Sequence, residues 1–193
     1  YFIHLPGIFI AYPSCAADAK GLLKMACRMD DPVIFMEHKG LYRQGYAATE
    51  EPDADYLLPF GKGRKVLEGD ELTVITWGAM VQKSLEAVQS SEIQNDSVEV
   101  IDLRTLNPLD MDLIETSIMK TSKALVVHED NITNGPGAEI AAIIADKFFE
   151  LLDGPVRRVG AKDSPVPFNW IIEEEILPQT VDVANAIQEL LEY

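Results

Sequence analysis

Three histidines are the residues of this sequence best suited to acid–base chemistry near neutral pH, and they stand at positions 4, 38 and 128. His128 is the best placed, because it ends the apolar run 124–128, and ligands of open parallel sheets collect beyond the carboxyl ends of the strands. His38 lies in the charged sequence Glu37-His38-Lys39, which is typical of a solvated loop, and His4 lies close to the first residue. For His128 two interpretations stay open: a group that acts on a ligand, or a histidine hydrogen-bonded at a junction between domains.

Two polar turns also follow expected strands. The sequence Asn134-Gly135-Pro136-Gly137 leads into a helix, and N–H groups at a helix start can hold a phosphate. It lacks the full dinucleotide-binding glycine pattern and the Lys-Ser/Thr of a P-loop, so it predicts a tight turn. Arg104 follows the sequence Asp102-Leu103, where its guanidinium either clamps a carboxylate with two hydrogen bonds or pairs with Asp102 or a neighbouring loop. The run Glu173-Glu174-Glu175 predicts a solvated face.

Alternating strands and helices must position these residues. Apolar runs and helical periodicity predict strands at 8–12, 33–37, 72–76, 98–103, 124–128 and 156–159, and helices at 14–30 (capped by Ser14), 80–94, 110–120 (capped by Asp110), 137–149 and 181–192. Residues 38–63 show no periodicity and predict a linker or a long irregular loop. This order predicts an α/β fold, a mostly parallel open sheet with helices on both faces.

The composition limits the classes of function. The 193 residues include 47% hydrophobic and 25% charged residues, an ordinary globular mixture, and the formal net charge is -16. A surface with that charge excludes binding to nucleic acid or to an anionic membrane, and it favours a basic partner. No apolar run has the length of a membrane span. The two cysteines, Cys15 and Cys27, fit no metal, redox or disulfide spacing, which favours the cytoplasm.

The chain divides into two parts of unequal charge and size. Residues 1–60 carry 5 basic and 8 acidic side chains, and residues 61–193 carry 11 and 24. The second part has enough elements for a core of its own, whereas two strands and one helix in the first part are marginal. We therefore expect residues 1–60 to be the tail of a domain that begins upstream, with apolar surface left exposed and oligomerisation favoured.

Several motifs carry a family resemblance. They are Pro6-Gly7, Pro13-Ser14, Asp18-Ala19-Lys20-Gly21-Leu22-Leu23, Asp31-Pro32-Val33-Ile34-Phe35-Met36-Glu37, Leu41-Tyr42-Arg43, Gly61-Lys62-Gly63, Trp77-Gly78, the run from Val98 to Asp110, Val126-Val127-His128-Glu129 and Gly137-Ala138-Glu139-Ile140-Ala141. Over nearly the whole chain these motifs resemble the beta subunit of the thiamine-diphosphate-dependent decarboxylating component of 2-oxo-acid dehydrogenase complexes, of the branched-chain or pyruvate type.

The resemblance implies a domain division and a function. Residues 1–60 would be the C-terminal portion of a pyrimidine-binding transketolase-like domain plus a linker, and residues 61–193 a transketolase C-terminal domain. The family oxidatively decarboxylates 2-oxo acids such as 2-oxoisovalerate or pyruvate and transfers the acyl group to lipoamide. Its partners are an alpha subunit, a second beta subunit and the basic peripheral-subunit-binding domain of the lipoyl acyltransferase. The implied location is the bacterial cytoplasm, or the mitochondrial matrix in a eukaryote.

The resemblance also assigns cofactors and site residues. Thiamine diphosphate and Mg²⁺ are held between subunits of the full assembly, and the family's activating glutamate and catalytic histidine lie upstream of Tyr1, so the chain alone should be inactive. His128 matches a histidine that points toward the inter-domain region and implies a positioning role. A structural K⁺ site, built mainly of backbone carbonyls, matches four residues at the end of the first helix: Ala26, Cys27, Met29 and Asp31.

Two alternatives accompany this interpretation. In the first, the chain is chiefly an interaction module that binds the acyltransferase's peripheral-subunit-binding domain without a direct role in chemistry, since residues 61–193 have an acid excess. In the second, it is an unrelated flavodoxin-like nucleotide-binding domain, an interpretation that rests on the strand–helix alternation and the Asn134-to-Gly137 turn.

Overall fold

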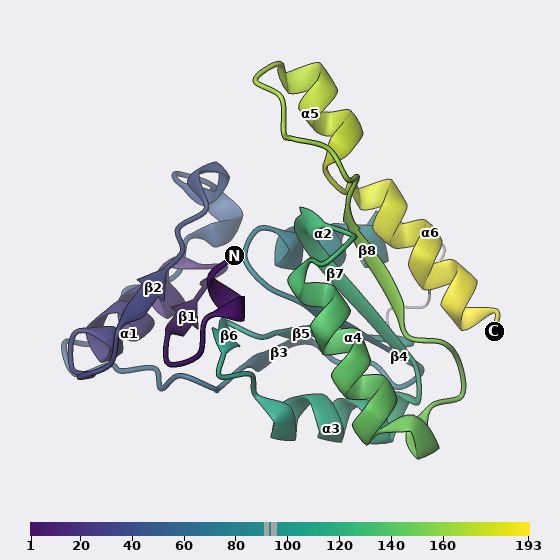
Figure 1. Ribbon diagram of the computed structural model, residues 1–193, viewed down its shortest axis with the longest axis horizontal. Coiled ribbons are helices and arrows are strands. Elements are labelled where there is room, and N and C mark those ends of the chain that lie inside the picture. The colour runs from purple at the N-terminus through teal and green to yellow at the C-terminus, as the bar shows by residue number, and fades with distance from the viewer. Residues whose placement is uncertain (91–92, 94–95) are drawn as a thin grey trace.

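Two sheets organise the fold of this computed structural model, which describes residues 1–90, 93 and 96–193 (Figure 1). The strands are β1 (Phe9–Ala11), β2 (Val33–Phe35), β3 (Arg64–Leu67), β4 (Leu72–Thr76), β5 (Val98–Asp102), β6 (Thr105–Asn107), β7 (Ala124–Asn131) and β8 (Arg157–Ala161). The α-helices are α1 (Ala16–Ala26), α2 (Met80–Ser90), α3 (Met111–Thr121), α4 (Pro136–Lys147), α5 (Trp170–Ile176) and α6 (Thr180–Leu191). The predicted alternation is present, and β3, β6 and α5 are additional.

The larger sheet has five strands in the order β3-β5-β4-β7-β8. Its four strands β5, β4, β7 and β8 pair in parallel, and β3 pairs antiparallel with β5 at one edge. Every residue of β4 and β5 is buried, as expected of central parallel strands that are covered on both faces. The predicted fold class, a mostly parallel open sheet with helices on both faces, is confirmed.

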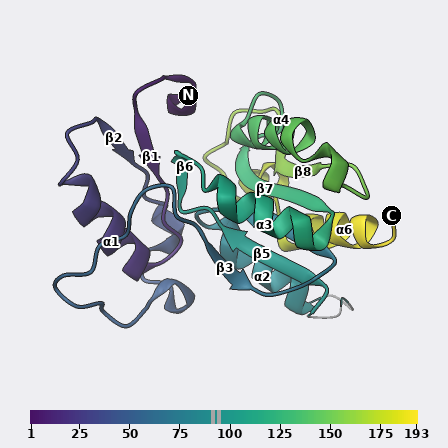
Figure 2. The ribbon, with the colours of Figure 1, turned by 90° about the horizontal axis from the view of Figure 1, so that it is seen from below.

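Two apolar cores hold the helices against this sheet. On one face, Ile114 and Ile118 of α3 and Ile140 and Ile144 of α4 pack in one cluster with Ile75 of β4. Figure 2 shows that α3 and α6 lie on different sides of the strands. On the other face, a second cluster joins residues of the sheet to α2 and α6. The two helices contribute six buried residues to it: Met80, Ala87, Val88, Val183, Ile187 and Leu190. The result is a three-layer α/β/α arrangement, the expected way to bury both faces of a parallel sheet.

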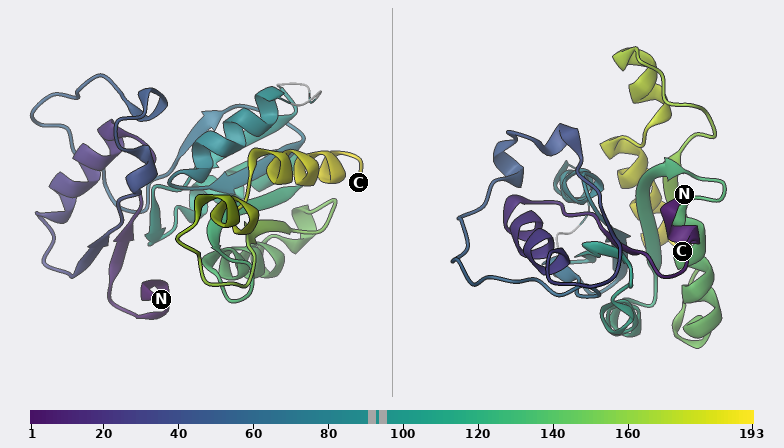
Figure 3. Two further views of the ribbon diagram at one scale, coloured as in Figure 1. Left: turned by 90° about the horizontal axis from the view of Figure 1, so that it is seen from above. Right: turned by 60° about the vertical axis from the view of Figure 1, so that its left-hand side comes forward.

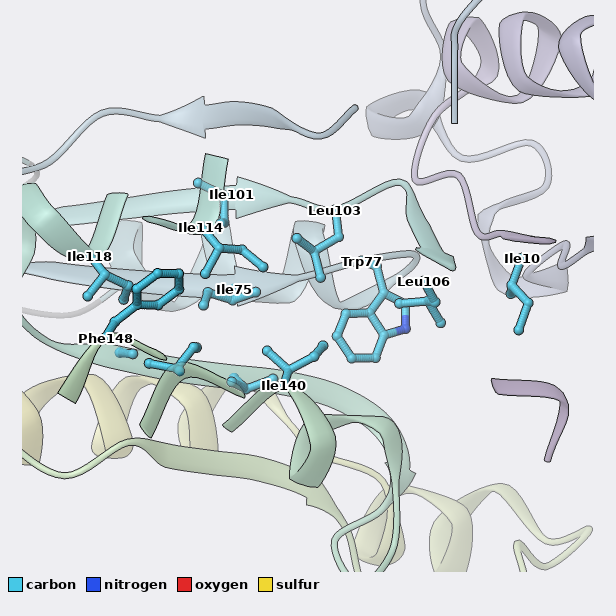
Figure 4. Close-up of a cluster of buried hydrophobic side chains, with 13 residues drawn as sticks. Ile10, Ile75, Trp77, Ile101, Leu103, Leu106, Ile114, Ile118, Ile140 and Phe148 are labelled. Atoms are coloured by element: carbon cyan, nitrogen blue, oxygen red, sulfur yellow. The ribbon is translucent and has the colours of Figure 1, made fainter. Parts of the chain in front are cut away.

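A smaller sheet connects the first part of the chain to the second. It has the order β2-β1-β6, in which β1 and β2 are parallel and β6 is antiparallel to β1. Because β6 follows the larger sheet's β5 in the chain, the two sheets are linked through residues 102–105. We call residues 1–60 the first unit and residues 61–193 the second unit. Both views of Figure 3 show the first unit against one end of the larger sheet. The apolar core continues in that direction: Figure 4 shows Trp77 and Leu106 on the side of the cluster that faces Ile10.

Helix ends test the predicted caps. The Asp110 carboxylate accepts a hydrogen bond from the N–H of Leu113 at 3.2 Å, which confirms it as the cap of α3. The prediction of Ser14 as the cap of the first helix is wrong, because Cys15 occupies that position and the Ser14 hydroxyl donates elsewhere. Helix α2 ends at Ser90 as described, and the predicted end at Gln94 lies outside the described residues.

Residues 38–63 are largely irregular, as predicted, with two short 3₁₀ turns at Lys39–Leu41 and Gly45–Ala47. Both cysteines, Cys15 and Cys27, are free. Within the described part of the chain, no helix combines the length and the apolar character needed to cross a membrane.

Candidate functional site

A network of buried charges joins α1 to the ends of the larger sheet's strands. Asp18 of α1 is 1% exposed, and its carboxylate accepts from the Arg104 guanidinium at 3.0 Å (Nε to Oδ2) and 2.8 Å (Nη2 to Oδ1). Arg64 Nη2 lies 3.4 Å from Asp18 and 3.5 Å from Asp102. The Ser14 hydroxyl donates to Asp102 at 2.5 Å. The network therefore fixes the first unit, through Ser14 and Asp18, to the second unit.

This geometry decides between the two uses predicted for Arg104. Its guanidinium clamps a carboxylate with two contacts, and that carboxylate belongs to Asp18 of the same chain. Its backbone N–H also donates to Asp102 at 3.0 Å, in a left-handed turn with φ of 60°. Arg104 therefore holds α1 and is not available to a substrate carboxylate.

Asp102 is fully buried, and burial raises its pKa to about 6, although the Ser14 hydroxyl and the Arg64 guanidinium both favour its charged form. A perturbed carboxyl group can mark an active site, but ion-pair networks produce the same perturbation. Here each oxygen has a partner within the chain: Oδ1 accepts from the Arg104 N–H and Oδ2 from Ser14. Asp102 therefore joins the two units and has no oxygen directed at a ligand.

His128 lies inside a strand and not at its end. Strand β7 continues to Asn131, three residues beyond the predicted end at His128, so the prediction of a strand-end position is wrong. Its side chain is fully buried, and its ring stacks on Trp77 with 5.7 Å between the ring centroids and 3° between the planes. Burial lowers the pKa of His128 to about 4, so the imidazole is neutral at physiological pH.

Glycines make the space that His128 occupies. A Cβ added to Gly137 would lie 2.3 Å from Nε2 of the ring, and one on Gly135 or Gly160 would lie 2.9 Å from its Cε1. Neither ring nitrogen has a hydrogen-bond partner among the described residues, although two buried nitrogens without partners are unfavourable. Among the described residues no hydrogen bond joins His128 to residues 1–60, so the interpretation of His128 as a histidine hydrogen-bonded at a junction between domains stays a prediction.

The Asn134-to-Gly137 turn provides two of the glycines that lie against the His128 ring, Gly135 and Gly137. Asn134 is left-handed with φ of 59°, and a Cβ on Gly135 would lie 2.1 Å from the Asn131 carbonyl oxygen. Gly135 is the N-cap residue of α4, and Pro136 follows it within the first helical turn. The turn is tight, as predicted.

His38 is the histidine whose surroundings the sequence does not reveal. Its Nε2 lies 3.0 Å from Oε2 and 3.3 Å from Oε1 of Glu129, which belongs to β7 of the other unit. The hydrogen bond to Glu129 raises the pKa of His38, and the side chain is only 26% exposed. The prediction of a solvated loop is therefore wrong for this side chain. Burial and Glu129 also raise the pKa of Tyr12 to about 12, so its phenol stays protonated.

Two hollows lie beside these groups. One, of about 270 Å³, lies between the two units, with Tyr12, Trp77 and Leu106 in its walls and Glu129 on its lining. A larger one, of about 520 Å³, lies in the first unit between the start of α1 and the 3₁₀ turns, and its lining includes His38. Ligand pockets commonly occupy about 300–1,000 Å³ and often lie where two domains meet. The junction hollow is slightly smaller than this range, but it lies where the two units meet and is lined by Glu129, which contacts His38, so the junction is the candidate functional site.

The residues matched to a K⁺ site lie together in sequence at the end of α1. Ala26 is the last helical residue and Cys27 is its C-cap, and the Met29 N–H donates to the Ala26 carbonyl at 3.1 Å. Carbonyl oxygens without helical partners concentrate at a helix C-terminus, where the helix dipole also favours a cation. The donor set is thus compatible with K⁺. Among the described residues no group of three or more His, Cys, Asp and Glu side chains is placed to hold a metal.

Comparison with protein families gives two matches along the chain. Residues 61–183 match the family described as "Transketolase, C-terminal domain", and residues 1–44 match "Transketolase, pyrimidine binding domain". The first match covers well over half of the chain.

Curated relatives are beta subunits. The chain is 38% identical over 193 residues to "2-oxoisovalerate dehydrogenase subunit beta 2, mitochondrial" of Arabidopsis thaliana, which covers 100% of this chain and 53% of the relative. It is 39% identical over 189 residues to "Pyruvate dehydrogenase E1 component subunit beta" of Rickettsia bellii, covering 98% of this chain and 57% of the relative. A Staphylococcus aureus protein of the same name is 40% identical over 188 residues, covering 97% and 57%. The chain spans just over half the length of these relatives.

A solved structure agrees with these matches. The protein described as "Split gene transketolase, inactive beta4 tetramer" superposes with a TM-score of 0.77 at 26% identity, covering 99% of this chain and 59% of that protein. The nucleotide-binding alternative gains no support from any of these matches. The curated relatives are beta subunits of pyruvate and 2-oxoisovalerate dehydrogenases, and by its match over residues 61–183 the chain belongs to the transketolase C-terminal domain family.

Proposed function

We propose that this chain is the C-terminal part of the beta subunit of a 2-oxo-acid dehydrogenase decarboxylating component, in which it serves assembly and partner docking. The observation that carries the proposal is its similarity along all 193 residues to a 2-oxoisovalerate dehydrogenase beta subunit, at 38% identity. Residues 1–60 would then be the end of the pyrimidine-binding domain plus a linker, and residues 61–193 the transketolase C-terminal domain. The matched segments 1–44 and 61–183 support a boundary near residue 60.

The proposed reaction of the full assembly is the oxidative decarboxylation of 2-oxoisovalerate or pyruvate, with transfer of the acyl group to lipoamide. Thiamine diphosphate, when bound, supplies the electron sink for loss of carbon dioxide. The described residues of this chain do not fit a Mg²⁺ site, since they hold no cluster of acidic and imidazole ligands. In line with the family resemblance, we propose that Mg²⁺ and the diphosphate are held by the alpha subunit and that this chain alone is inactive.

This chain's residues contribute by holding the two units in a fixed relation. The Asp18–Arg104 pair and the Ser14–Asp102 hydrogen bond connect α1 to the larger sheet. A buried pair with good geometry is costly to break, which makes the junction rigid. We assign His128 a positioning role, because its neutral ring fills the space between Trp77 and the start of α4.

We also propose that K⁺ binds at the end of α1, through carbonyl oxygens at Ala26, Cys27, Met29 and Asp31. A K⁺ ion that binds only the folded chain stabilises it by mass action. The melting temperature should therefore be higher in KCl than in NaCl at equal ionic strength. An equal melting temperature in KCl and NaCl would contradict the proposed K⁺ site.

The interaction-module alternative is favoured by a specific observation, the excess of 24 acidic over 11 basic side chains in residues 61–193. Opposite charge speeds and orients association, so this part suits docking of the acyltransferase's basic peripheral-subunit-binding domain. The two functions are compatible within one assembly. The relatives include a mitochondrial plant protein and bacterial proteins, which supports a location in the mitochondrial matrix or the bacterial cytoplasm.

Assembly with an alpha subunit tests the proposal. The chain and the alpha subunit of the same dehydrogenase are mixed at micromolar concentration and studied by sedimentation velocity. The proposal predicts a species with the mass of two alpha and two beta chains, whereas two separate boundaries with no complex would contradict it.

A further inference from the structure

The larger hollow of the first unit, here called the α1 hollow, has the walls of a small-molecule site. Its volume is about 520 Å³, and it lies between the start of α1 and the 3₁₀ turns that follow β2 (Figure 1). Six of its lining residues have apolar side chains: Pro13, Ala16, Ala19, Leu41, Ala47 and Ala48. Ligand pockets are typically apolar, with a few polar groups that fix the orientation of the ligand. The walls therefore suit a ligand with an aliphatic body, and the polar lining residues define its head group.

His38 brings to this lining a hydrogen-bond donor that lacks an acceptor. Its Nε2 lies 3.0 Å from Oε2 of Glu129, and the hydrogen bond to Glu129 raises the pKa of His38. Glu129 thus favours the protonated ring, which carries a second N–H at Nδ1. Nδ1 is buried and has no hydrogen-bond partner among the described residues. A buried donor without an acceptor is unfavourable, so a ligand that brings an acceptor oxygen is favoured here.

The absence of a side chain at Gly40 leaves room beside this nitrogen. A Cβ added to Gly40 would lie 3.0 Å from Nδ1 of His38 and 2.8 Å from its Cε1. Any other residue type at position 40 would therefore crowd the unpaired N–H. The local sequence keeps this donor uncovered by a neighbouring side chain.

Arg43 supplies a second cationic group to the α1 hollow. Its side chain is exposed, and within the described part of the chain no carboxylate pairs with it. Its backbone is left-handed, with φ of 63°, a conformation that is uncommon for residues other than glycine. A guanidinium binds a carboxylate through two parallel hydrogen bonds. The hollow also meets the start of α1 at Cys15 and Ala16, where the positive end of the helix dipole favours an anion.

The neighbouring carboxylates restrict the charge of the ligand. Glu37 also lines the α1 hollow, and its carboxylate accepts from the Tyr42 hydroxyl. Glu129 is already paired with His38. A second negative charge on the ligand would meet repulsion from these carboxylates without a further cation to balance it. The charges therefore favour a monoanion over a dianion such as phosphate.

We propose that the α1 hollow binds a short aliphatic monocarboxylate, with the carboxylate held by His38 and Arg43 and the hydrocarbon part against the apolar wall. The 2-oxo acids of the proposed function belong to this chemical class. The site itself requires neither an alpha subunit nor thiamine diphosphate, so it goes beyond the proposed function and is tested without the assembly.

The test is titration calorimetry of the chain with isovalerate at millimolar concentration. Isovalerate should bind saturably, whereas 3-methylbutan-1-ol, its neutral analogue, and inorganic phosphate should bind about tenfold more weakly or not at all. Arg43→Gln should weaken the binding of isovalerate about tenfold, the usual cost of a lost charge-assisted hydrogen bond. The matched control is Arg157→Gln, because Arg157 is an exposed arginine of β8 in the second unit, and it should leave the affinity unchanged. Circular dichroism melts of the three proteins should coincide, since both arginines are exposed.

A second measurement reports on His38 directly. Its ring nitrogen signals in NMR spectra should shift when isovalerate is added, and 3-methylbutan-1-ol should leave them in place. The proposal is overturned if isovalerate does not bind, if the neutral alcohol binds equally well, if phosphate binds more tightly, or if Arg43→Gln and Arg157→Gln bind isovalerate with the same affinity. It is also overturned if a beta subunit of full family length, which contains this chain, fails to bind isovalerate, because the rest of the subunit would then fill the hollow. None of these results depends on complex formation with an alpha subunit, so the proposed function is judged separately.

Discussion

Two buried side chains at the junction respond to pH in opposite directions. The pKa of His128 is lowered from 6.5 to about 4, so the unfolded chain binds more protons than the folded one between these values. The lowered pKa therefore contributes stability to the folded chain above pH 6.5, and this contribution is lost as the pH falls from 6.5 to about 4. The pKa of Asp102 is raised from 3.8 to about 6, so its contribution is present below pH 3.8 and is lost as the pH rises through 6. The two effects oppose one another between pH 4 and 6.

A His128→Phe variant isolates the imidazole's share. The aromatic ring preserves the stack on Trp77, and any cost of its larger size is independent of pH. When the pH falls from 7 to 4, the unmodified chain should lose about 3 kcal/mol of unfolding free energy relative to the variant. This follows from about 1.4 kcal/mol for each unit by which the pKa is lowered. Urea unfolding at the two pH values measures this. A difference that is the same at both would show that His128 is not buried in its neutral form.

The Asp18–Arg104 pair is predicted to be the most sensitive contact between the units. Arg104→Ala leaves the Asp18 carboxylate, 1% exposed, with Arg64 at 3.4 Å as its remaining cationic contact among the described residues. Removing one partner of a buried pair costs about 3–5 kcal/mol. The matched control is Arg28→Ala, an exposed arginine that donates to the Lys24 carbonyl, and it should cost about 0.5 kcal/mol or less. Equal losses in the two variants, measured by chemical denaturation, would refute a structural role for the pair.

At the scale of elements, the start of α4 and the strand β7 are predicted to be coupled through one glycine. A Cβ on Gly137 would lie 2.3 Å from the His128 ring, so Gly137→Ala should destabilise by about 1–3 kcal/mol, although alanine normally favours a helix. Gly45→Ala, where no atom lies within 4 Å, is the control and should be near neutral. In a double-mutant cycle, His128→Ala should remove most of the Gly137→Ala penalty. Strict additivity of the two substitutions would contradict the proposed contact.

The elements that could be predicted from the sequence are those that bury one regular face. Strand β4 and helix α3 follow from apolar spacing, because α3 places Ile114 and Ile118 in the core at helical spacing. Strand β3 was not predicted, because an edge strand of sequence Arg-Lys-Val-Leu is only half-buried and shows no alternation. Helix α5 was not predicted either, because it buries no residue and therefore has no periodicity to detect.

The candidate site was less predictable than the fold, because its contacts join distant positions. For Arg104 the sequence left two uses open and could not identify the partner, because Asp18 lies 86 residues away. His38 and Glu129 are 91 residues apart, and no spacing rule connects them. For His128 the prediction of importance came from its strand, and the stack on Trp77 and the surrounding glycines required coordinates. Its positioning role and the K⁺ site both stay predictions.

At the scale of the whole molecule, the net charge of -16 makes a prediction about docking. If the acidic second unit receives the basic peripheral-subunit-binding domain, raising NaCl from 50 to about 500 mM should weaken binding, mainly through a lower association rate, because exposed charges are screened beyond about 10 Å. Surface plasmon resonance at several salt concentrations measures this. Affinity independent of salt, or no binding at low salt, would exclude a charge-steered contact.

The central claim is that this chain is a scaffold whose chemistry requires an alpha subunit and the rest of a beta subunit. The direct measurement is decarboxylation of 2-oxoisovalerate and pyruvate, with thiamine diphosphate, Mg²⁺ and an artificial electron acceptor. It compares the chain alone with a beta subunit of full family length that contains it, combined with the alpha subunit. The account predicts turnover of one of the two acids by the complete assembly and none by the chain alone. Turnover by the chain alone, or of neither acid by the complete assembly, would contradict it.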